Sequence, residues 1–282
     1  MVYIADETIE RWMKEDVPYG DLTSWLLEIG QCPGKIQYFS REETLLCGTE
    51  EAVRIFTKLG ATVQTALPSG SFVKPGELLL SAEGTAGALH QGWKVALNIL
   101  ECASAIATRT YRLVKAAKSI NSNLEILATR KNFPGTKELA IKAILAGGAL
   151  PHRLGLSETI LIFEQHRVFL DGFEALVTKI PELKARACEK KIIVEVETLD
   201  EAIRLANAGV DGIQFDKVDA SILETWVRAL RKINPALILL AAGGVNEGNI
   251  ASYAKTGVNG IATTAVFFGK PADIRAKISK IY

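Results

Sequence analysis

From residue 125 onward, short apolar runs alternate with longer segments in which apolar residues recur every three or four positions. The runs are 125–128 (EILA), 159–163 (TILIF), 192–196 (IIVEV), 212–215 (GIQF), 237–241 (LILLA) and 258–262 (VNGIA). Each run predicts a buried strand, and the segments 137–146, 172–188, 199–207, 219–232 and 247–255 predict helices. This alternation predicts a parallel sheet. Six strands are fewer than the eight of a closed barrel, so we expect a smaller or open β/α barrel. A flat doubly wound sheet is the alternative, ranked second because no GxGxxG follows any strand.

The first 84 residues or so have a different pattern. Segments 6–15 and 49–59 have helical periodicity, and 35–40, 44–47, 62–67 and 78–82 read as strands separated by Pro/Gly-rich turns. This mixture predicts a small α+β layer. Residues 86–119 predict a long helix, broken near Ala103 and Ser104, that bridges the two halves.

Composition narrows the class of protein. Of 282 residues, 48% are apolar and 23% charged, and the net charge is +1, as in an ordinary globular protein with no overall preference for nucleic acid or membrane. No apolar run reaches the ~20 residues that a membrane helix needs. The four cysteines are scattered, which predicts reduced thiols. We therefore expect a cytoplasmic protein.

Polar or glycine residues follow every predicted strand of the second half, at the edge where barrels and doubly wound sheets bind ligands. They are Arg130 and Lys131, then Glu164, Gln165 and His166, then Glu195 and Glu197, then Asp216 and Lys217, then Gly243 and Gly244, and finally Thr263 and Thr264. The two cations at the end of the first strand indicate that the strand ends form one common site, and that this site binds an anion.

Glu195 and Glu197 are two residues apart and share one face of their strand, the face opposite Val194 and Val196. Buried carboxylates need a cation, either a metal ion or a structural lysine partner. With Asp216 on the next strand, we expect these acids to face Mg²⁺, which is usually bound by one or two carboxylates plus substrate phosphates.

Three further features favour an anionic substrate. Gly243 and Gly244 precede a helix expected to begin near Asn246, and a helix N-terminus attracts phosphate. His152 and Arg153 lie together in a loop flanked by glycine and proline. Arginine offers a planar fork that matches carboxylate and phosphate groups.

Several motifs, in order, resemble those of quinolinate (nicotinate-nucleotide) phosphoribosyltransferases. They are EDVPYGDLTS (15–24), LNILECASAIAT (97–108), TRKNFPGTK (129–137), GGALPHRLGLSETILI (147–162), VEVETLDEA (194–202) and FDKV (215–218). The stretches around 128–166 and 262–274 are more similar still to the ModD branch of pyrophosphorylases, which is associated with molybdate transport genes.

The resemblance implies an α/β enzyme with two domains. These are an α/β sandwich over 1–105, joined by a C-terminal helix at 271–282, and an open, six-to-seven-stranded β/α barrel over 106–270. It also implies a homodimer or higher oligomer whose active site borrows a residue from the neighbouring subunit. The implied reaction transfers 5-phosphoribosyl from PRPP to a nitrogen heterocycle and releases pyrophosphate with Mg²⁺.

The resemblance also implies roles for individual residues. Arg130, His152 and Arg153 match positions that hold the acid groups of the heterocycle, and Lys131 matches a lysine near the phosphates. Glu197 and Asp216 match acids that face PRPP and its metal, and Glu195 or Glu197 would meet charge developing at the ribose C1. The list of expected substrate-binding residues is completed by Lys94, Gly243, Gly244, Thr263 and Thr264.

Two departures from the family pattern change the expected acceptor. Lys94 stands where the family has an arginine, and Phe163 stands where it has a lysine that contacts substrate. Removing a charged partner of a buried anion costs roughly 2–5 kcal/mol. We therefore expect an acceptor less acidic than quinolinate.

Two other functions remain open at this point. One is a Schiff-base enzyme that uses Lys131 or Lys217 as nucleophile. The other is a catalytically silent protein that binds a small anion or nucleotide on the same fold.

Overall fold

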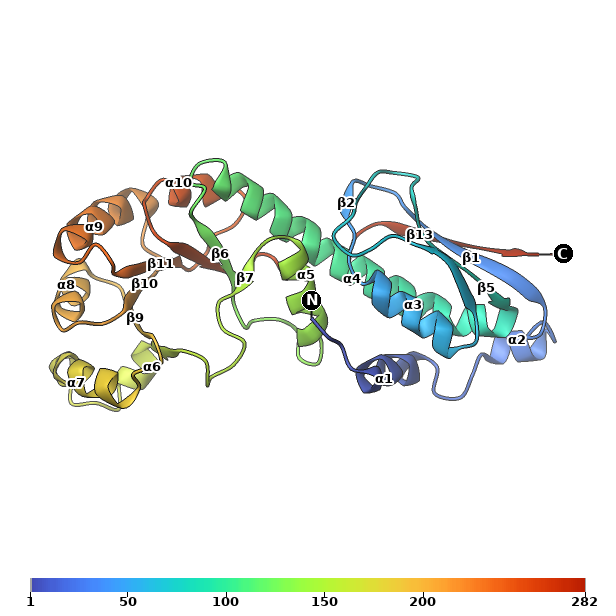
Figure 1. Ribbon diagram of the computed structural model, residues 1–282, viewed down its shortest axis with the longest axis horizontal. Coiled ribbons are helices and arrows are strands. Elements are labelled where there is room, and N and C mark those ends of the chain that lie inside the picture. Colours follow the sequence, from blue (N-terminus) through green and yellow to red (C-terminus); the bar gives the residue numbers. More distant parts are fainter. Residues whose placement is uncertain (1, 282) are drawn as a thin grey trace. The chain divides into compact units, whose positions relative to one another are not determined.

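The computed structural model describes residues 2–281 and divides into two compact units. Unit 1 contains the chain up to Tyr111, the segment Asn132–Gly148 and the chain from Val266 onward. Unit 2 contains Arg112–Lys131 and Ala149–Ala265. Figure 1 labels most of the helices and strands of the two units.

Unit 1 is built on an antiparallel sheet. Its strand order is β13 (Ile274–Lys280), β1 (Pro33–Ser40), β5 (Leu78–Thr85) and β3 (Thr62–Ala66), and a short pair joins β2 (Thr44–Leu45) to β4 (Phe72–Val73). The helices of this unit are α1 (Asp6–Asp16), α2 (Leu22–Leu26), α3 (Thr49–Lys58) and α5 (Lys137–Ala146), with most of α4 (Ala86–Lys118). Residues of β1 alternate between buried and less buried, and Ile36 and Tyr38 enter the core. The strands and helices expected in the first part of the chain are present.

The C-terminal segment corrects one expectation. We expected a helix over 271–282, but Ile274–Lys280 is strand β13, paired antiparallel with β1. The apolar residues Ile274, Ala276 and Ile278 alternate with polar ones and pack on the core of unit 1. A two-residue period is that of a strand with one buried face.

Helix α4 is continuous for 33 residues, so the expected break near Ala103 and Ser104 is wrong. Small residues are needed there because the backbone at Cys47 and Gly48 packs closely on the helix. The buried Ser104 hydroxyl accepts a hydrogen bond from Cys47 N and donates one to Cys47 O. A Cβ on Gly48 would lie 3.4 Å from that of Ala103.

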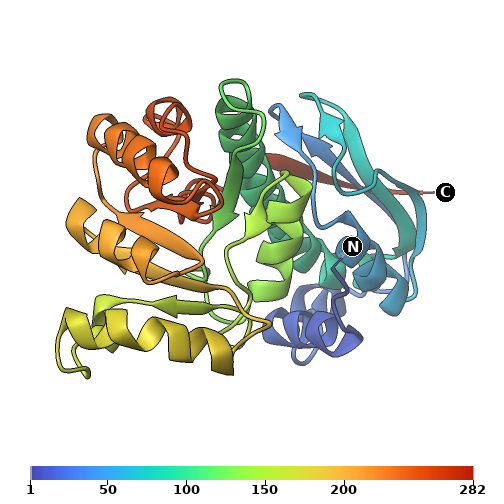
Figure 2. The same cartoon turned by 60° about the vertical axis from the view of Figure 1, so that its left-hand side comes forward.

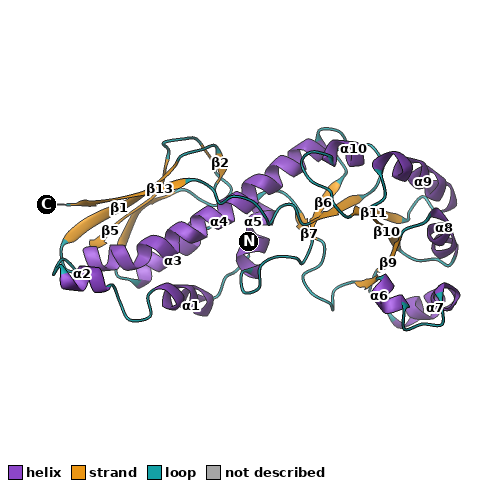
Figure 3. Cartoon of the chain, turned by 180° about the vertical axis from the view of Figure 1, so that it is seen from behind, coloured by secondary structure: helices purple, strands orange, loops and turns teal. Residues whose placement is uncertain are grey.

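Unit 2 is a curved parallel sheet, open between its two edge strands. The order is β7 (Leu150–Pro151), β6 (Glu125–Ala128), β12 (Gly260–Thr263), β11 (Ile238–Ala242), β10 (Gly212–Asp216), β9 (Ile192–Val196) and β8 (Ile160–Ile162). Helices α6 (Glu164–Arg167), α7 (Phe173–Arg186), α8 (Leu199–Asn207), α9 (Ala220–Ile233) and α10 (Ile250–Ala254) complete the unit, and α7, α8 and α9 line the outer side of the sheet (Figures 2 and 3). The open barrel is confirmed, with all six expected strands and one more, β7.

Alternation along the strands separates the two faces of this sheet. Leu161, Ile193 and Leu240 form an apolar cluster inside the barrel, and Leu127, Phe163 and Ile238 pack against it. Val194 and Val196 are fully buried on the opposite, helix-covered face. Glu195 therefore points inward, as the sequence predicts.

Two expectations from composition can be compared with the structure. Among residues 2–281, no helix combines the length and the apolar character required to cross a membrane. All four cysteines are free thiols.

Candidate functional site

A cavity of about 520 Å³ lies at the carboxyl ends of the strands of unit 2. Ten of the site residues expected from the sequence line it: Arg130, Lys131, His152, Arg153, Glu195, Asp216, Gly243, Gly244, Thr263 and Thr264. The remaining lining residues are Thr129, Leu161, Phe163, Gln214, Lys217, Ala242, Val245, Asn246, Ala262 and Ala265. The convergence of strand ends expected from the sequence is therefore present within one unit.

One wall of the cavity carries positive charge. Within the described residues, no carboxylate forms an ion pair with Arg130, Lys131 or Arg153. Burial, together with the charge of Arg130, lowers the pKa of the Arg153 guanidinium. Its Cζ lies 5.7 Å from the centroid of the Phe163 ring, within cation–π range. Cations that have no carboxylate partner among the described residues provide a binding surface for an anion.

His152 contributes to this wall without a charge at neutral pH. Burial, and secondarily the positive charge of Arg153, lowers the pKa of its imidazole to about 4. A neutral imidazole has one N–H donor and one acceptor nitrogen. His152 can therefore orient a substrate by hydrogen bonding, while the arginines supply the attraction for an anion.

Carboxylates also line the cavity, at the ends of β9 and β10, where Lys217 Nζ lies 3.6 Å from Asp216 Oδ2. Glu195 on β9 accepts a 2.6 Å hydrogen bond from Gln214 Nε2 on β10. Burial raises the pKa of the Glu195 carboxyl, as do the charges of Asp216 and Glu197, against the lowering effect of the Gln214 hydrogen bond. Glu195 and Asp216 line the cavity, whereas Glu197 follows the last residue of β9, is exposed and is absent from the lining.

The Gly243 turn is shaped around Asp216. Gly243 has φ +85°, and a Cβ there would lie 2.6 Å from Asp216 Oδ1 and 2.7 Å from Lys217 N. Only glycine tolerates both this backbone conformation and this close approach. Thr263 is buried and donates a 2.6 Å hydrogen bond to Val245 O, so its hydroxyl holds the turn in place.

The phosphate site expected at a helix near Asn246 has a different geometry. Helix α10 begins at Ile250 and has five residues. Asn246 instead closes the preceding turn, because its side chain donates to Gly244 O and accepts from Gly248 N. Asparagine competes with helix formation through such local hydrogen bonds. Any phosphate contact in this region would come from the glycine turn.

Lys94 does not line this cavity. It lies on α4 in unit 1, where its Nζ is 4.6 Å from the centroid of the Trp93 ring. Its expected contact with substrate stays a prediction.

Among the lining residues to which sequence reasoning assigned no ligand contact are Leu161 and Gln214. Both are inward-facing by strand alternation, and a glutamine inside the run GIQF was the available signal. Phe163, noted as a departure from the family, stacks on His166 with ring centroids 5.8 Å apart and forms an aromatic side of the cavity.

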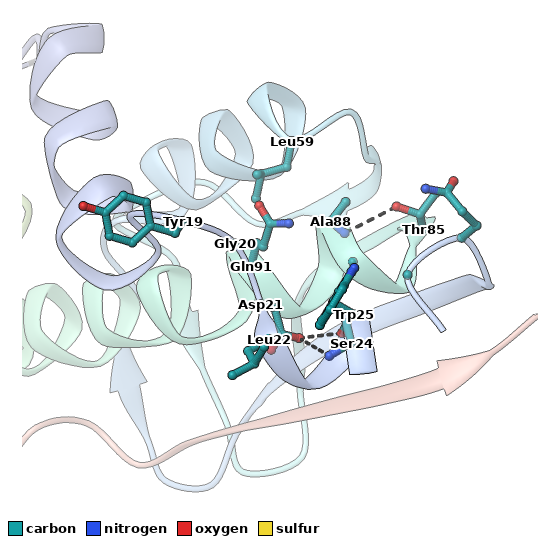
Figure 4. Close-up of a pocket in the computed structure, with 13 residues that line it drawn as sticks. Tyr19, Gly20, Asp21, Leu22, Ser24, Trp25, Leu59, Thr85, Ala88 and Gln91 are labelled. Atoms are coloured by element: carbon teal, nitrogen blue, oxygen red, sulfur yellow. Dashed lines mark hydrogen bonds between the residues drawn. The ribbon is translucent and has the colours of Figure 1, made fainter. Parts of the chain in front are cut away.

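A larger cavity, of about 800 Å³, lies in unit 1 around α2 (Figure 4). Its one carboxylate, Asp21, caps α2 by accepting from Thr23 N and Ser24 N, and it also accepts from the Ser24 hydroxyl. Tyr19 and Trp25 at its rim are largely exposed. Without opposed charges, this cavity lacks the chemistry found in unit 2.

Fold and site together define a two-unit α/β protein whose open barrel brings cations and carboxylates into one cavity at the carboxyl ends of its strands. The chain matches "Quinolinate phosphoribosyl transferase, C-terminal domain" over residues 106–275 and the N-terminal domain of the same name over 21–104. The chain therefore belongs to the quinolinate phosphoribosyltransferase family.

Curated relatives place it near one branch of that family. It is 36% identical over 280 residues to "Putative pyrophosphorylase ModD" of Pasteurella multocida, covering 99% of each chain. It is 38% identical over 257 residues to the ModD protein of Rhodobacter capsulatus, covering 91% of this chain and 98% of that one. Among solved structures, NadC from Streptococcus pyogenes is 25% identical with a TM-score of 0.88, covering 98% of this chain and 97% of that one.

Proposed function

We propose that the cavity of unit 2 binds PRPP beside a nitrogen heterocycle and transfers the 5-phosphoribosyl group to it, releasing pyrophosphate. The observation that carries this proposal is that one cavity holds both cations without a carboxylate partner among the described residues and the carboxylates of Glu195 and Asp216. The cations match phosphate and carboxylate groups, and the acids match a metal-bound diphosphate and a sugar carbon that gains positive charge. Membership of the family supports the same reaction type.

The residues present fit an ion such as Mg²⁺ only when substrate completes its coordination. Among residues 2–281, no group of three or more His, Cys, Asp or Glu side chains is arranged to hold a metal. Magnesium is usually held by one or two carboxylates plus substrate phosphates. Asp216, with Glu195, would hold it, and the ion would neutralise charge on the pyrophosphate. Glu197, outside the lining, is the weaker candidate.

In the proposed reaction, a lone pair of the heterocycle nitrogen forms a bond to the ribose C1. The bond from C1 to the pyrophosphate oxygen breaks, and pyrophosphate leaves with its electron pair. Arg130 and Arg153 hold an anionic group of the heterocycle, and His152 orients it through a neutral N–H. Glu195, which lines the cavity, would stabilise positive charge at C1. Catalysis would then consist of positioning and electrostatic stabilisation.

Two measurements test this function. Mg-PRPP should raise the melting temperature of the protein, and a panel of pyridine, purine and pterin acids should include one that releases pyrophosphate. Arg153→Met should weaken both effects, while Lys232→Met, an exposed change on α9, should leave them intact. Absence of both a thermal shift and pyrophosphate release would rule out the transferase.

A catalytically silent binding protein predicts a different result, namely a PRPP thermal shift without turnover on any acceptor. A homodimer, a cytoplasmic location and an association with molybdate transport also stay predictions. Light scattering of the purified protein measures the first of these.

A further inference from the structure

Gln214 is a buried polar residue on the floor of the cavity. Its side chain is 4% exposed, and it lies on β10 between Glu195 of β9 and Leu240 of β11 in register. Residues 214 and 216 share the inward face of β10, so Gln214 is one layer deeper than Asp216. The amide lines the cavity together with Phe163 and Leu161.

Only one end of this amide has a partner. Nε2 donates to Glu195 Oε2 at 2.6 Å, while Oε1 is buried and has no hydrogen-bond partner within residues 2–281. The orientation of the amide follows from its neighbour, because a carboxylate accepts hydrogen bonds and leaves Nε2 as the atom that must face it. Buried side-chain oxygens are normally paired with protein, water or ligand, and the cavity that Gln214 lines is the place from which a donor can reach it.

The surroundings of Oε1 restrict that donor. Phe163 and Leu161, which line the same cavity, are apolar, and the guanidinium of Arg153, 5.7 Å from the Phe163 ring centroid, attracts negative charge. A second carboxylate on the substrate, placed near Gln214, would be repelled by the lone pairs of Oε1 and by the carboxylate of Glu195. A group with an N–H or O–H would satisfy the oxygen, and an aromatic ring would contact Phe163.

We infer that Gln214 is a specificity-determining residue that accepts a hydrogen bond from the acceptor substrate. The substrate class is a planar heterocycle with one anionic group, held by the arginines, and one hydrogen-bond donor directed at Gln214 Oε1. This inference rests on the proposed function and narrows its acceptor.

The test uses ligand pairs matched in shape, 6-aminonicotinate against 6-methylnicotinate, with quinolinate as the dicarboxylate. Calorimetry on the full chain with Mg²⁺ and pyrophosphate should show the amino compound binding about tenfold more tightly than the methyl compound, as expected for a donor that reaches a buried acceptor. Quinolinate should bind more weakly than either.

Variants separate a direct contact from an effect through Glu195. Gln214→Met should bring the amino-to-methyl ratio close to one, whereas Glu195→Gln should keep the preference because Gln214 remains. An equal affinity of the wild-type protein for both compounds, or a preference that survives Gln214→Met, would overturn the inference. The wild-type comparison suffices if the methionine variant fails to fold.

PRPP binding distinguishes the two levels of the proposal. A PRPP thermal shift without binding of the amino compound rejects the inference and leaves the transferase function standing. Loss of the PRPP shift as well rejects both.

Discussion

Lys142 on α5 is the test case for charge buried inside unit 1. Its side chain is 8% exposed, and its Nζ lies 2.6 Å from Glu51 Oε2 and 2.7 Å from Glu50 Oε2. The Glu51 side chain is 3% exposed, so water cannot replace the lysine. The two ion pairs join α5 to α3, two helices of unit 1 that are far apart in the sequence.

Replacing Lys142 by methionine keeps most of the apolar stem and removes the charge. The variant leaves the Glu51 carboxylate buried and uncompensated, and breaking a buried pair in this way costs about 3–5 kcal/mol. Urea unfolding followed by circular dichroism measures this free energy. Because most of the loss comes from the stranded carboxylate, the double variant K142M/E51Q should recover at least half of it.

An exposed ion pair of the same unit provides the control. Lys58 Nζ lies 2.8 Å from Glu10 Oε1 at the surface, and Lys58→Met should have a much smaller effect on the free energy of unfolding. If Lys142→Met were as mild as Lys58→Met, or if the double variant were less stable than the single one, the assumed desolvation of Glu51 would be wrong.

The pH dependence offers a second check on the same cluster. Burial alone would raise the pKa of Glu50, but hydrogen bonds from Lys142 and Ser69 outweigh it and bring the pKa down to about 2 from 4.5. A depressed carboxyl pKa stabilises the folded state above the unfolded value, and this contribution is lost as pH falls from about 4.5 toward 2. Lys142→Met should flatten that part of the stability profile.

Three further predictions concern the cavity of unit 2. Gly243→Ala should reduce the PRPP thermal shift because its Cβ displaces Asp216, whereas Gly209→Ala, with a similarly positive φ and open space around it but outside the cavity lining, should retain the shift at a comparable backbone cost. Asp216→Asn should abolish the Mg²⁺-dependent part of the PRPP shift, and Glu197→Gln should not, since Glu197 lies outside the lining; the opposite ranking would reassign the metal. Since the pKa of His152 falls from 6.5 to about 4 on folding, the unfolding free energy should decrease by up to about 3 kcal/mol as pH is lowered across that interval, and His152→Gln should remove this component in urea titrations at successive pH values.

Strand alternation explains why much of the site could be predicted. A two-residue period fixed which side chains of β9 and β10 face the cavity, and the carboxyl ends of parallel strands meet at one edge. The position along each strand at which side chains stop lining the cavity was harder to predict. Glu195 and Glu197 share a face, but β9 ends at Val196, so only Glu195 lies within the cavity.

Other features depended on contacts distant in sequence. Residues 132–148 interrupt the barrel sequence yet belong to unit 1, where Lys142 meets acids more than 90 residues away. Strand β13 forms only because β1 offers an edge for pairing. The start of α10 was misplaced because Asn246 satisfies the local backbone in a turn. None of these partners can be recognised from local periodicity.

The layers inside unit 2 explain how a barrel interior tolerates polar side chains. Leu161 and Ile193 are in register and form an apolar layer, and Glu195 and Gln214, in register with Leu240, follow one step nearer the carboxyl ends. The hydrogen bond between these two satisfies one end of each group, since a buried polar atom without a partner is costly. Gln214 Oε1 has no hydrogen-bond partner among residues 2–281, and the proposal that the acceptor substrate supplies one would make this costly polar layer the part of the barrel that selects the substrate.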